Sequence, residues 1–195
     1  MKILSYVGGN KRVLDTGCAT GYLAKRLKEK SCYVVGIEGD EKAAEVARQF
    51  CDEVIVSDVE KIENLPRYEN FFDVIVYGDI LEHLKRPDLV LMKFRRYLSS
   101  NGYVVASIPN VAYWRSRLNL LLGRFEYDDF PGIDKSHLRF FTLKTMKELF
   151  KNTGYKIAKI DYTGSASRLK LLRILPTLFV FQFIIIAKRS DKQYA

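Results

Sequence analysis

Short apolar runs alternate with amphipathic segments along the first 110 residues of the chain. The runs have the length and β-branched content of buried strands and lie at 11–15, 33–38, 53–56, 72–77 and 103–108. Between them, apolar residues recur three or four positions apart, which predicts helices at 22–30, 41–50 and 87–98. Strict alternation of strand and helix predicts a parallel sheet with right-handed crossovers.

The pattern changes after Pro109. An apolar stripe from Trp114 to Phe125 has helical spacing and predicts an additional helix at 111–124. Such a stripe either belongs to the core or, because it follows the fifth strand, forms a lid over a binding site; we favour the lid. The rest of the chain predicts helices at 143–152 and 167–175 and strands at 155–162 and 179–188.

Together these elements predict a Rossmann-like, doubly wound α/β sheet. It is expected to be mostly parallel and to have about seven strands, with the last strand antiparallel beside residues 155–162 and a helical lid inserted after strand five. We expect a single domain over residues 1–195.

Charge is distributed unevenly along the chain. Residues 1–110 carry 16 basic and 16 acidic side chains, whereas residues 111–195 carry 16 basic and 7 acidic ones, so the net charge of +9 belongs to the second part. A basic second part favours an acidic partner, although solubility alone also explains such an excess.

The cysteines indicate the compartment. Cys18, Cys32 and Cys51 are odd in number, widely spaced and without a zinc-type cluster, so we expect reduced thiols in the cytoplasm. The N-terminal segment lacks the pattern of a signal peptide, and no apolar run has the length of a membrane span.

Polar and small residues collect after the predicted strands, where open parallel sheets bind ligands. They are Asp15-Thr16-Gly17-Cys18-Ala19-Thr20-Gly21, Glu38-Gly39, Asp58-Val59, Gly78-Asp79 with Glu82 and His83, and Pro109-Asn110. Glycines permit close approach of a ligand to the backbone, and a carboxylate at position 38 can accept both hydroxyls of a ribose. A dehydrogenase-type GxGxxG and a phosphate loop are both absent.

These motifs resemble those of the class I S-adenosylmethionine-dependent methyltransferases, and the resemblance covers nearly the whole chain. It implies that the cofactor is S-adenosylmethionine, with S-adenosylhomocysteine as product. By resemblance, Glu38 binds the ribose, Asp58 lies near the adenine amine and Val59 beside the ring. Ala19 stands where this family more often has glycine, and we expect binding to survive. The cofactor-binding residues are Asp15, Gly17, Cys18, Ala19, Gly21, Glu38, Gly39, Asp58, Val59 and Gly78.

A second stretch points to a branch of this family. The segments Ser107–Val111, Gly123–Phe125 and Gly132–Thr142 are similar to those of bacterial ubiquinone-biosynthesis O-methyltransferases and methionine-biosynthesis W-type proteins. The expected domain then has a cofactor-binding half at 1–110, a lid or substrate insertion at 111–142 and a C-terminal completion of helix and strand at 143–195.

Methyl transfer to a hydroxyl needs a group that takes the hydroxyl proton. The two histidines, His83 and His137, both fall in segments expected at the open face, and with Asp79 they are the expected catalytic residues. Each histidine also has a purely structural interpretation, as a packing or loop-fixing residue. Asp79, Glu82 and the two histidines resemble a divalent-metal site as well, although we expect no metal.

The expected acceptor is a small anionic or lipid- or sugar-linked metabolite, methylated on oxygen in preference to nitrogen. Arg115, Arg117 and Arg139 are candidate contacts to its charge. Peripheral contact with a membrane fits the basic second part, and RNA is a weaker alternative as partner. A cofactor-binding module without catalysis is the rival from another class, and the oligomeric state stays open.

Overall fold

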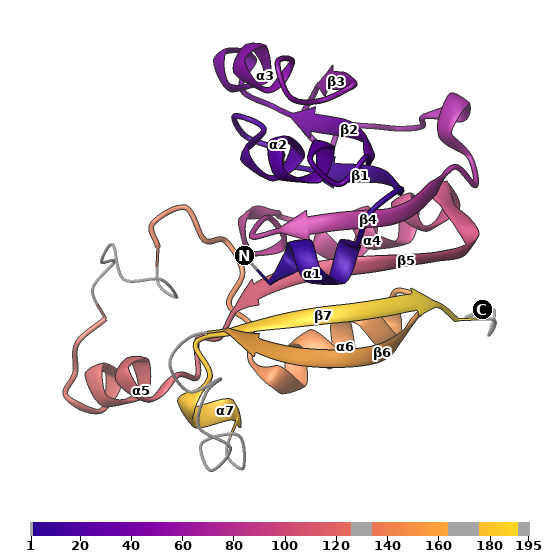
Figure 1. The fold of residues 1–195 in the computed structure, drawn as a ribbon. Coiled ribbons are helices and arrows are strands. Elements are labelled where there is room, and N and C mark those ends of the chain that lie inside the picture. Colours follow the sequence, from indigo (N-terminus) through magenta and orange to yellow (C-terminus); the bar gives the residue numbers. More distant parts are fainter. Residues whose placement is uncertain (1, 126–133, 164–175, 191–195) are drawn as a thin grey trace.

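The sheet at the centre of the molecule has seven strands in the order β3-β2-β1-β4-β5-β7-β6 (Figure 1). The computed structural model describes residues 2–125, 134–163 and 176–190. The strands are β1 (Arg12–Thr16), β2 (Tyr33–Glu38), β3 (Glu53–Val56), β4 (Phe72–Gly78), β5 (Leu98–Pro109), β6 (Tyr155–Thr163) and β7 (Gln182–Arg189). The helices are α1 (Ile3–Val7), α2 (Tyr22–Lys28), α3 (Glu41–Ala47), α4 (Pro87–Phe94), α5 (Trp114–Leu121), α6 (Leu143–Asn152) and α7 (Pro176–Phe179).

Strands β1 to β5 pair in parallel, and β7 lies antiparallel between β5 and β6. The predicted fold class, strand number and antiparallel end of the sheet are therefore confirmed. Parallel pairing requires a crossover between consecutive strands. Helices α2, α3 and α4 lie in three of these connections, and the connection from β3 to β4 holds a short 3-10 turn at Pro66–Tyr68. Among the described residues, no helix combines the length and apolar character needed to cross a membrane.

Helices cover both faces of the sheet, and alternate residues of β4 show this directly. Val74 and Val76 pack into one core with α1 and α2, whereas Ile75 and Tyr77 pack into the other core with α4 and α6. A strand that is covered on both faces needs an uninterrupted apolar run, as residues 74–77 supply. The two cores hold β1 and β4 rigidly, and the carboxyl ends of these strands therefore form a firm edge.

Several predicted boundaries were wrong. Strand β5 begins at Leu98, five residues early, because Leu98 already pairs with Phe72 before an irregularity in the register. Helix α4 ends at Phe94, and a short 3-10 turn follows it. Strand β7 begins at Gln182, because the residues after Pro176 form the turn of α7. The basic helix predicted at 167–175 lies outside the described residues.

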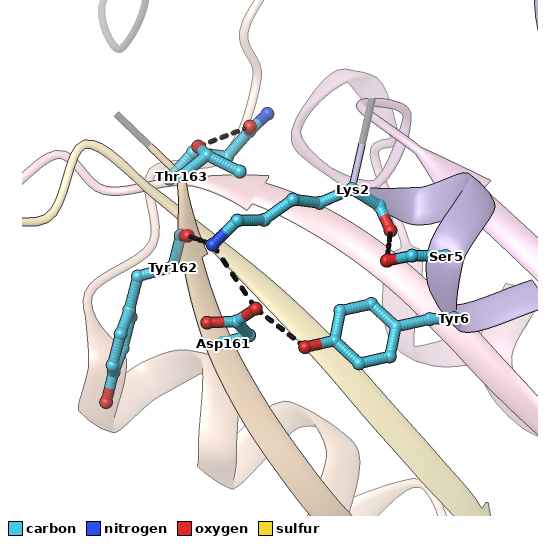
Figure 2. A network of polar contacts seen from close by, with 7 residues as sticks. Lys2, Ser5, Tyr6, Asp161, Tyr162 and Thr163 are labelled. Carbon is cyan, nitrogen blue, oxygen red and sulfur yellow. Dashed lines mark hydrogen bonds and ion pairs between the residues drawn. The ribbon is translucent and has the colours of Figure 1, made fainter. Parts of the chain in front are cut away.

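Helix α1 was not predicted from the sequence, and side chains from the other end of the chain hold it in place (Figure 2). The Tyr6 hydroxyl donates to Asp161 of β6 at 2.6 Å, and the Lys2 ammonium lies 3.3 Å from the same carboxylate. Lys2 also donates to the carbonyl of Tyr162. We call these four residues the α1 clasp. The clasp matters for the site because Ile3 of α1 lies beside Gly78 at the end of β4.

Opening the clasp should destabilise the protein. Burial opposes ionisation of Asp161, but the hydrogen bonds from Tyr6, the backbone and Lys2 outweigh it, so its pKa lies below the ordinary value. Asp161→Asn should therefore lower the free energy of unfolding at pH 7 by about 1–2 kcal/mol, with a loss that shrinks as the pH falls through the carboxyl range. Urea titrations at pH 7 and pH 3.5 measure both values. Ser5→Ala is the control, because the Ser5 hydroxyl donates to the backbone carbonyl of Lys2 and not to Asp161; an equal loss there would contradict the prediction.

Candidate cofactor and acceptor site

The loop after β1 turns sharply at two glycines. Gly17 and Gly21 have φ of +69° and +77°, in the left-handed region that favours glycine. A Cβ on Gly17 would lie 2.5 Å from Ile80 Cδ1, and one on Gly21 would lie 3.0 Å from the Ala47 Cα. From the sequence we expected a ligand to lie close to the backbone at these glycines. In the structure, protein atoms occupy the positions that side chains at Gly17 and Gly21 would take. The two glycines therefore shape the loop instead of clearing room at its surface.

Ala19 lies in the same loop with φ +46°, also in the left-handed region. A side chain in this conformation costs about 1 kcal/mol, which explains why glycine is favourable at this position. Its backbone amide donates to Glu38 Oε2 at 2.8 Å. The strained residue is thus held by the carboxylate that the sequence assigned to the ribose.

Glu38 ends β2 and connects the loop to the next helix. Besides the amide of Ala19, its carboxylate accepts the amide of Asp40 through Oε1 at 2.8 Å. Each carboxylate oxygen receives one hydrogen bond and keeps a further lone pair. The half-exposed side chain can therefore accept two additional hydroxyl groups while it fixes the loop.

Asp15 is buried at the end of β1, and its Oδ2 has no hydrogen-bond partner. Burial, with a smaller contribution from the charge of Glu38, raises its pKa to about 7. A buried carboxylate without a partner is unfavourable unless a ligand supplies a donor or a positive charge. S-adenosylmethionine carries an ammonium group, a sulfonium and a ribose diol, so Asp15 and Glu38 fit its charge and its hydrogen-bonding groups.

The remaining predicted cofactor residues lie along the same edge of the sheet. Val59 is buried, and Asp58 is exposed with its Oδ1 accepting the amide of Glu60 at 3.0 Å. A Cβ on Gly39 would meet only the backbone near Asp58, at 3.8 Å, so the surface beside these two residues is open. The structure therefore brings the ends of β1, β2, β3 and β4 together as predicted.

The two histidines meet although 54 positions separate them. The rings of His83 and His137 lie 4.8 Å apart, nearly perpendicular to each other. The backbone carbonyl of Glu82 accepts the amides of Leu138 and Arg139 at 2.8 and 2.9 Å. These bonds attach the segment after residue 134 to the end of β4 and place His137 at His83.

Glu82 lies next to the histidines; the sequence named it only as part of a possible divalent-metal site and not as a catalytic residue. Its side chain is buried, and neither carboxylate oxygen has a hydrogen-bond partner. Burial raises the pKa of Glu82 to about 8. Ligand atoms of Glu82, His83 and His137 all lie within 4.8 Å of one another, so the three side chains can share a proton or hold a divalent cation. The absence of a metal remains a prediction.

Asp79 lies on the approach to the histidines with φ +56°, a second strained residue in the site. Its amide donates to the Ser107 hydroxyl at 3.0 Å, and its carboxylate accepts from Gln182. Ser107 and Gln182 come from β5 and β7; the sequence placed Ser107 in a family-like segment without a role at Asp79, and it gave no signal for Gln182. Their alignment opposite Gly78 and Pro109 in the sheet register is a product of the tertiary structure.

The arginines expected at the acceptor have protein partners. Arg139 donates to the carbonyl of Lys85, and Arg117 donates to the carbonyl of Ala112 at 2.7 Å. Both side chains therefore help to fix the backbone of the insertion, and Arg115 lies on α5 beside Arg117. Their contact with a substrate remains a prediction.

Helix α5 does not form part of the core in the described structure. Its apolar side chains stay exposed, up to 83% for Leu121, and only Ser116 of the helix is buried. The apolar stripe from Trp114 to Phe125 is therefore not part of the core in this arrangement. The helix projects from the end of β5, at the edge of the sheet that carries the site (Figure 1).

Comparison with known proteins shows the family of the chain. The fold is that of S-adenosylmethionine-dependent methyltransferases: one from Archaeoglobus fulgidus has a TM-score of 0.71 at 22% identity, covering 96% of this chain and 90% of that one. A second, from Mesorhizobium loti, has a TM-score of 0.67 at 18% identity, covering 96% and 94%. Residues 2–160 match the family described as Methyltransferase domain. The chain therefore belongs to the class I S-adenosylmethionine-dependent methyltransferase family, whose cofactor is S-adenosylmethionine.

The curated relatives that this chain matches are longer than the chain. The ubiquinone biosynthesis O-methyltransferase of Neisseria meningitidis serogroup A is 30% identical over 118 residues, which cover 55% of this chain and 50% of that protein. The protein of the same name from Coxiella burnetii is 21% identical over 157 residues, covering 79% and 66%. The chain thus spans one half to two thirds of the length of these relatives.

The buried Glu82 should make the stability of the protein depend on pH. In the unfolded chain this carboxyl ionises near pH 4.5, whereas in the folded chain it resists ionisation until about pH 8. Folding is therefore penalised increasingly as the pH rises through this window, by up to about 4 kcal/mol.

Glu82→Gln should remove this penalty. The variant should unfold at a higher temperature than the parent chain at pH 8 and at a similar temperature at pH 5. Thermal melts at the two pH values provide the measurement, and Glu63→Gln, an exposed change, is the control. A Glu82→Gln variant that is less stable at pH 8 would show that the carboxylate has a stabilising partner.

Proposed function

We propose that this chain transfers a methyl group from S-adenosylmethionine to a hydroxyl oxygen of a small anionic or lipid- or sugar-linked metabolite. The observation that carries the proposal is the meeting of His83 and His137, backed by the buried Glu82, beside the edge where the predicted cofactor residues lie. Proton removal from an acceptor needs such a group, whereas cofactor binding alone does not.

The cofactor, when bound, supplies an activated methyl group on a sulfonium. The residues of the chain hold and orient the cofactor. Glu38 accepts hydrogen bonds from the ribose hydroxyls, and Asp15 lies toward the positively charged groups of the cofactor. Asp58 and Val59 border the adenine. Because the loop from Asp15 to Gly21 is fixed by Glu38 before any ligand arrives, little ordering is needed on binding.

The acceptor hydroxyl would lie at Asp79 and the two imidazoles. A neutral imidazole takes the hydroxyl proton as the new bond to carbon forms, and the resulting positive charge lies near the carboxylate of Glu82. Glu82 is thus a positioning residue that stabilises the protonated state. The exposed apolar face of α5 and the nearby arginines support an acceptor with an apolar part and a negative charge.

Binding of the cofactor product tests the first half of the proposal. Glu38→Ala should weaken S-adenosylhomocysteine binding at least tenfold, because it removes both ribose acceptors and releases the amide of Ala19. Isothermal titration calorimetry measures the affinity, with Glu41→Ala as control, since Glu41 lies in the first turn of α3 and outside the predicted site. Unchanged affinity in Glu38→Ala would overturn the assigned site.

Transfer of a labelled methyl group from the cofactor to fractions of a cell extract tests the second half. Label in the lipid or soluble-metabolite fraction supports the proposal, and label in RNA would establish the RNA alternative. With the labelled acceptor, His83→Ala and His137→Ala should each lower turnover at least tenfold, and near-parental rates in both would exclude a histidine base.

Two further outcomes would decide against the proposal. Activity lost with a chelator and restored by Mn²⁺ would mean that Glu82 and the histidines hold a cation in place of taking a proton. Binding of S-adenosylhomocysteine with no label in any fraction would support the non-catalytic module.

A further inference from the structure

Two of the three cysteines meet behind the cofactor loop. Cys18 belongs to the loop between Gly17 and Ala19, and Cys51 follows helix α3. Both sulfurs lie against Gly36 of β2, where a Cβ would be 2.6 Å from Cys18 Sγ and 3.1 Å from Cys51 Sγ. Only glycine at position 36 leaves room for the pair. The two sulfurs are therefore neighbours, and hydrogen bonding between them is the largest influence on the pKa of each thiol.

The surroundings make the two thiols unequal. The hydrogen bond from Cys18 lowers the pKa of Cys51, and Lys28 lowers it further, while burial, Asp15 and Asp52 act in the opposite direction. The same hydrogen bond, together with burial and the charges of Asp15, Cys51 and Glu38, raises the pKa of Cys18. Cys51 is also partly exposed, whereas Cys18 is buried. An accessible thiol of lowered pKa beside a second thiol is the arrangement of a reversible redox pair.

We propose that Cys51 and Cys18 are oxidised by a hydroperoxide to a reversible disulfide that ties the cofactor loop to the end of α3. The Cys51 thiolate attacks the peroxide, which breaks the O–O bond and leaves a sulfenic acid on Cys51. Cys18 then attacks this sulfur, and water leaves as the S–S bond forms. Two thiols and one hydrogen peroxide give one disulfide and two waters, with sulfur oxidised and peroxide oxygen reduced.

The disulfide would act on the proposed cofactor site, on which this consequence rests. A disulfide brings its sulfurs to about 2.05 Å, closer than any hydrogen-bonded pair of thiols, so the loop or the end of α3 must shift. The loop cannot shift without losing hydrogen bonds, because the amide of Cys18 donates to the carbonyl of Ile37 at 3.0 Å and the amide of Ala19 donates to Glu38. Oxidation should therefore displace the amide of Ala19 from Glu38 and weaken cofactor binding.

Mass spectrometry tests the disulfide directly. The reduced chain is treated with a small excess of hydrogen peroxide, blocked with N-ethylmaleimide and digested with trypsin. The expected product joins peptides 13–25 and 49–61, which carry Cys18 and Cys51. Cys32 is the internal control, because its sulfur lies near the carbonyls of Gly8 and Lys30, away from the pair. Absence of the joined peptides, or equal crosslinking of Cys32, would overturn the proposal.

Calorimetry tests the effect on the site. Oxidation should weaken S-adenosylhomocysteine binding at least fivefold in the parent chain and in Cys32→Ser, and dithiothreitol should restore it. The Cys51→Ser variant should bind S-adenosylhomocysteine with the same affinity before and after peroxide treatment. A disulfide that changes the affinity less than twofold would overturn the regulatory part. If the reduced chain binds no S-adenosylhomocysteine, the proposed function fails, whereas the mass spectrum still decides the disulfide.

Discussion

Carboxylates without partners at one edge of the sheet are the constraint on which the rest of this structure depends. Asp15 and Glu82 are both buried at the ends of strands β1 and β4, and neither has a complete set of hydrogen-bond partners. Such groups cost folding free energy, and the two apolar cores on either face of the sheet offset that cost. A fold that retains them keeps two carboxyl groups whose ionised form a cationic ligand at Asp15 and an imidazolium at Glu82 would stabilise.

Two residues at the same edge have a strained backbone. Ala19 and Asp79 both have positive φ, and the amide of each donates a hydrogen bond that fixes it, to Glu38 in one case and to Ser107 in the other. The neighbouring parallel strands are held rigidly by their cores, so the loops after them can keep unfavourable conformations. The α1 clasp extends this rigidity, because the contact with Asp161 of β6 fixes α1 and keeps Ile3 beside Gly78.

The two ends of the site differ in how they are enclosed. Where the cofactor residues lie, the loop after β1 is packed against Ile80 and Ala47 and has few ways to move. On the acceptor side, α5 leaves its apolar face exposed, and the segment after residue 134 is attached through hydrogen bonds to the backbone of Glu82 and Lys85. A rigid cofactor edge and an open acceptor edge suit a family in which the methyl donor is constant and the acceptor varies.

The sequence by itself determined the fold class, the strand–helix alternation and the edge of the sheet that carries the site. Apolar runs such as Val74-Ile75-Val76 are buried on both faces only in a parallel sheet, and the ends of parallel strands must lie together. Neighbouring residues alone also account for the caps of α3 and α6, where the side chains of Asp40 and Thr142 accept backbone amides of the first turn. The tertiary structure alone decided the contacts between distant segments: helix α1 against Asp161, His137 against His83, Gln182 against Asp79, and Cys18 against Cys51. No local sequence pattern predicts these pairs, because the two residues of each pair are far apart in the chain and meet only when the strands have assembled into the sheet.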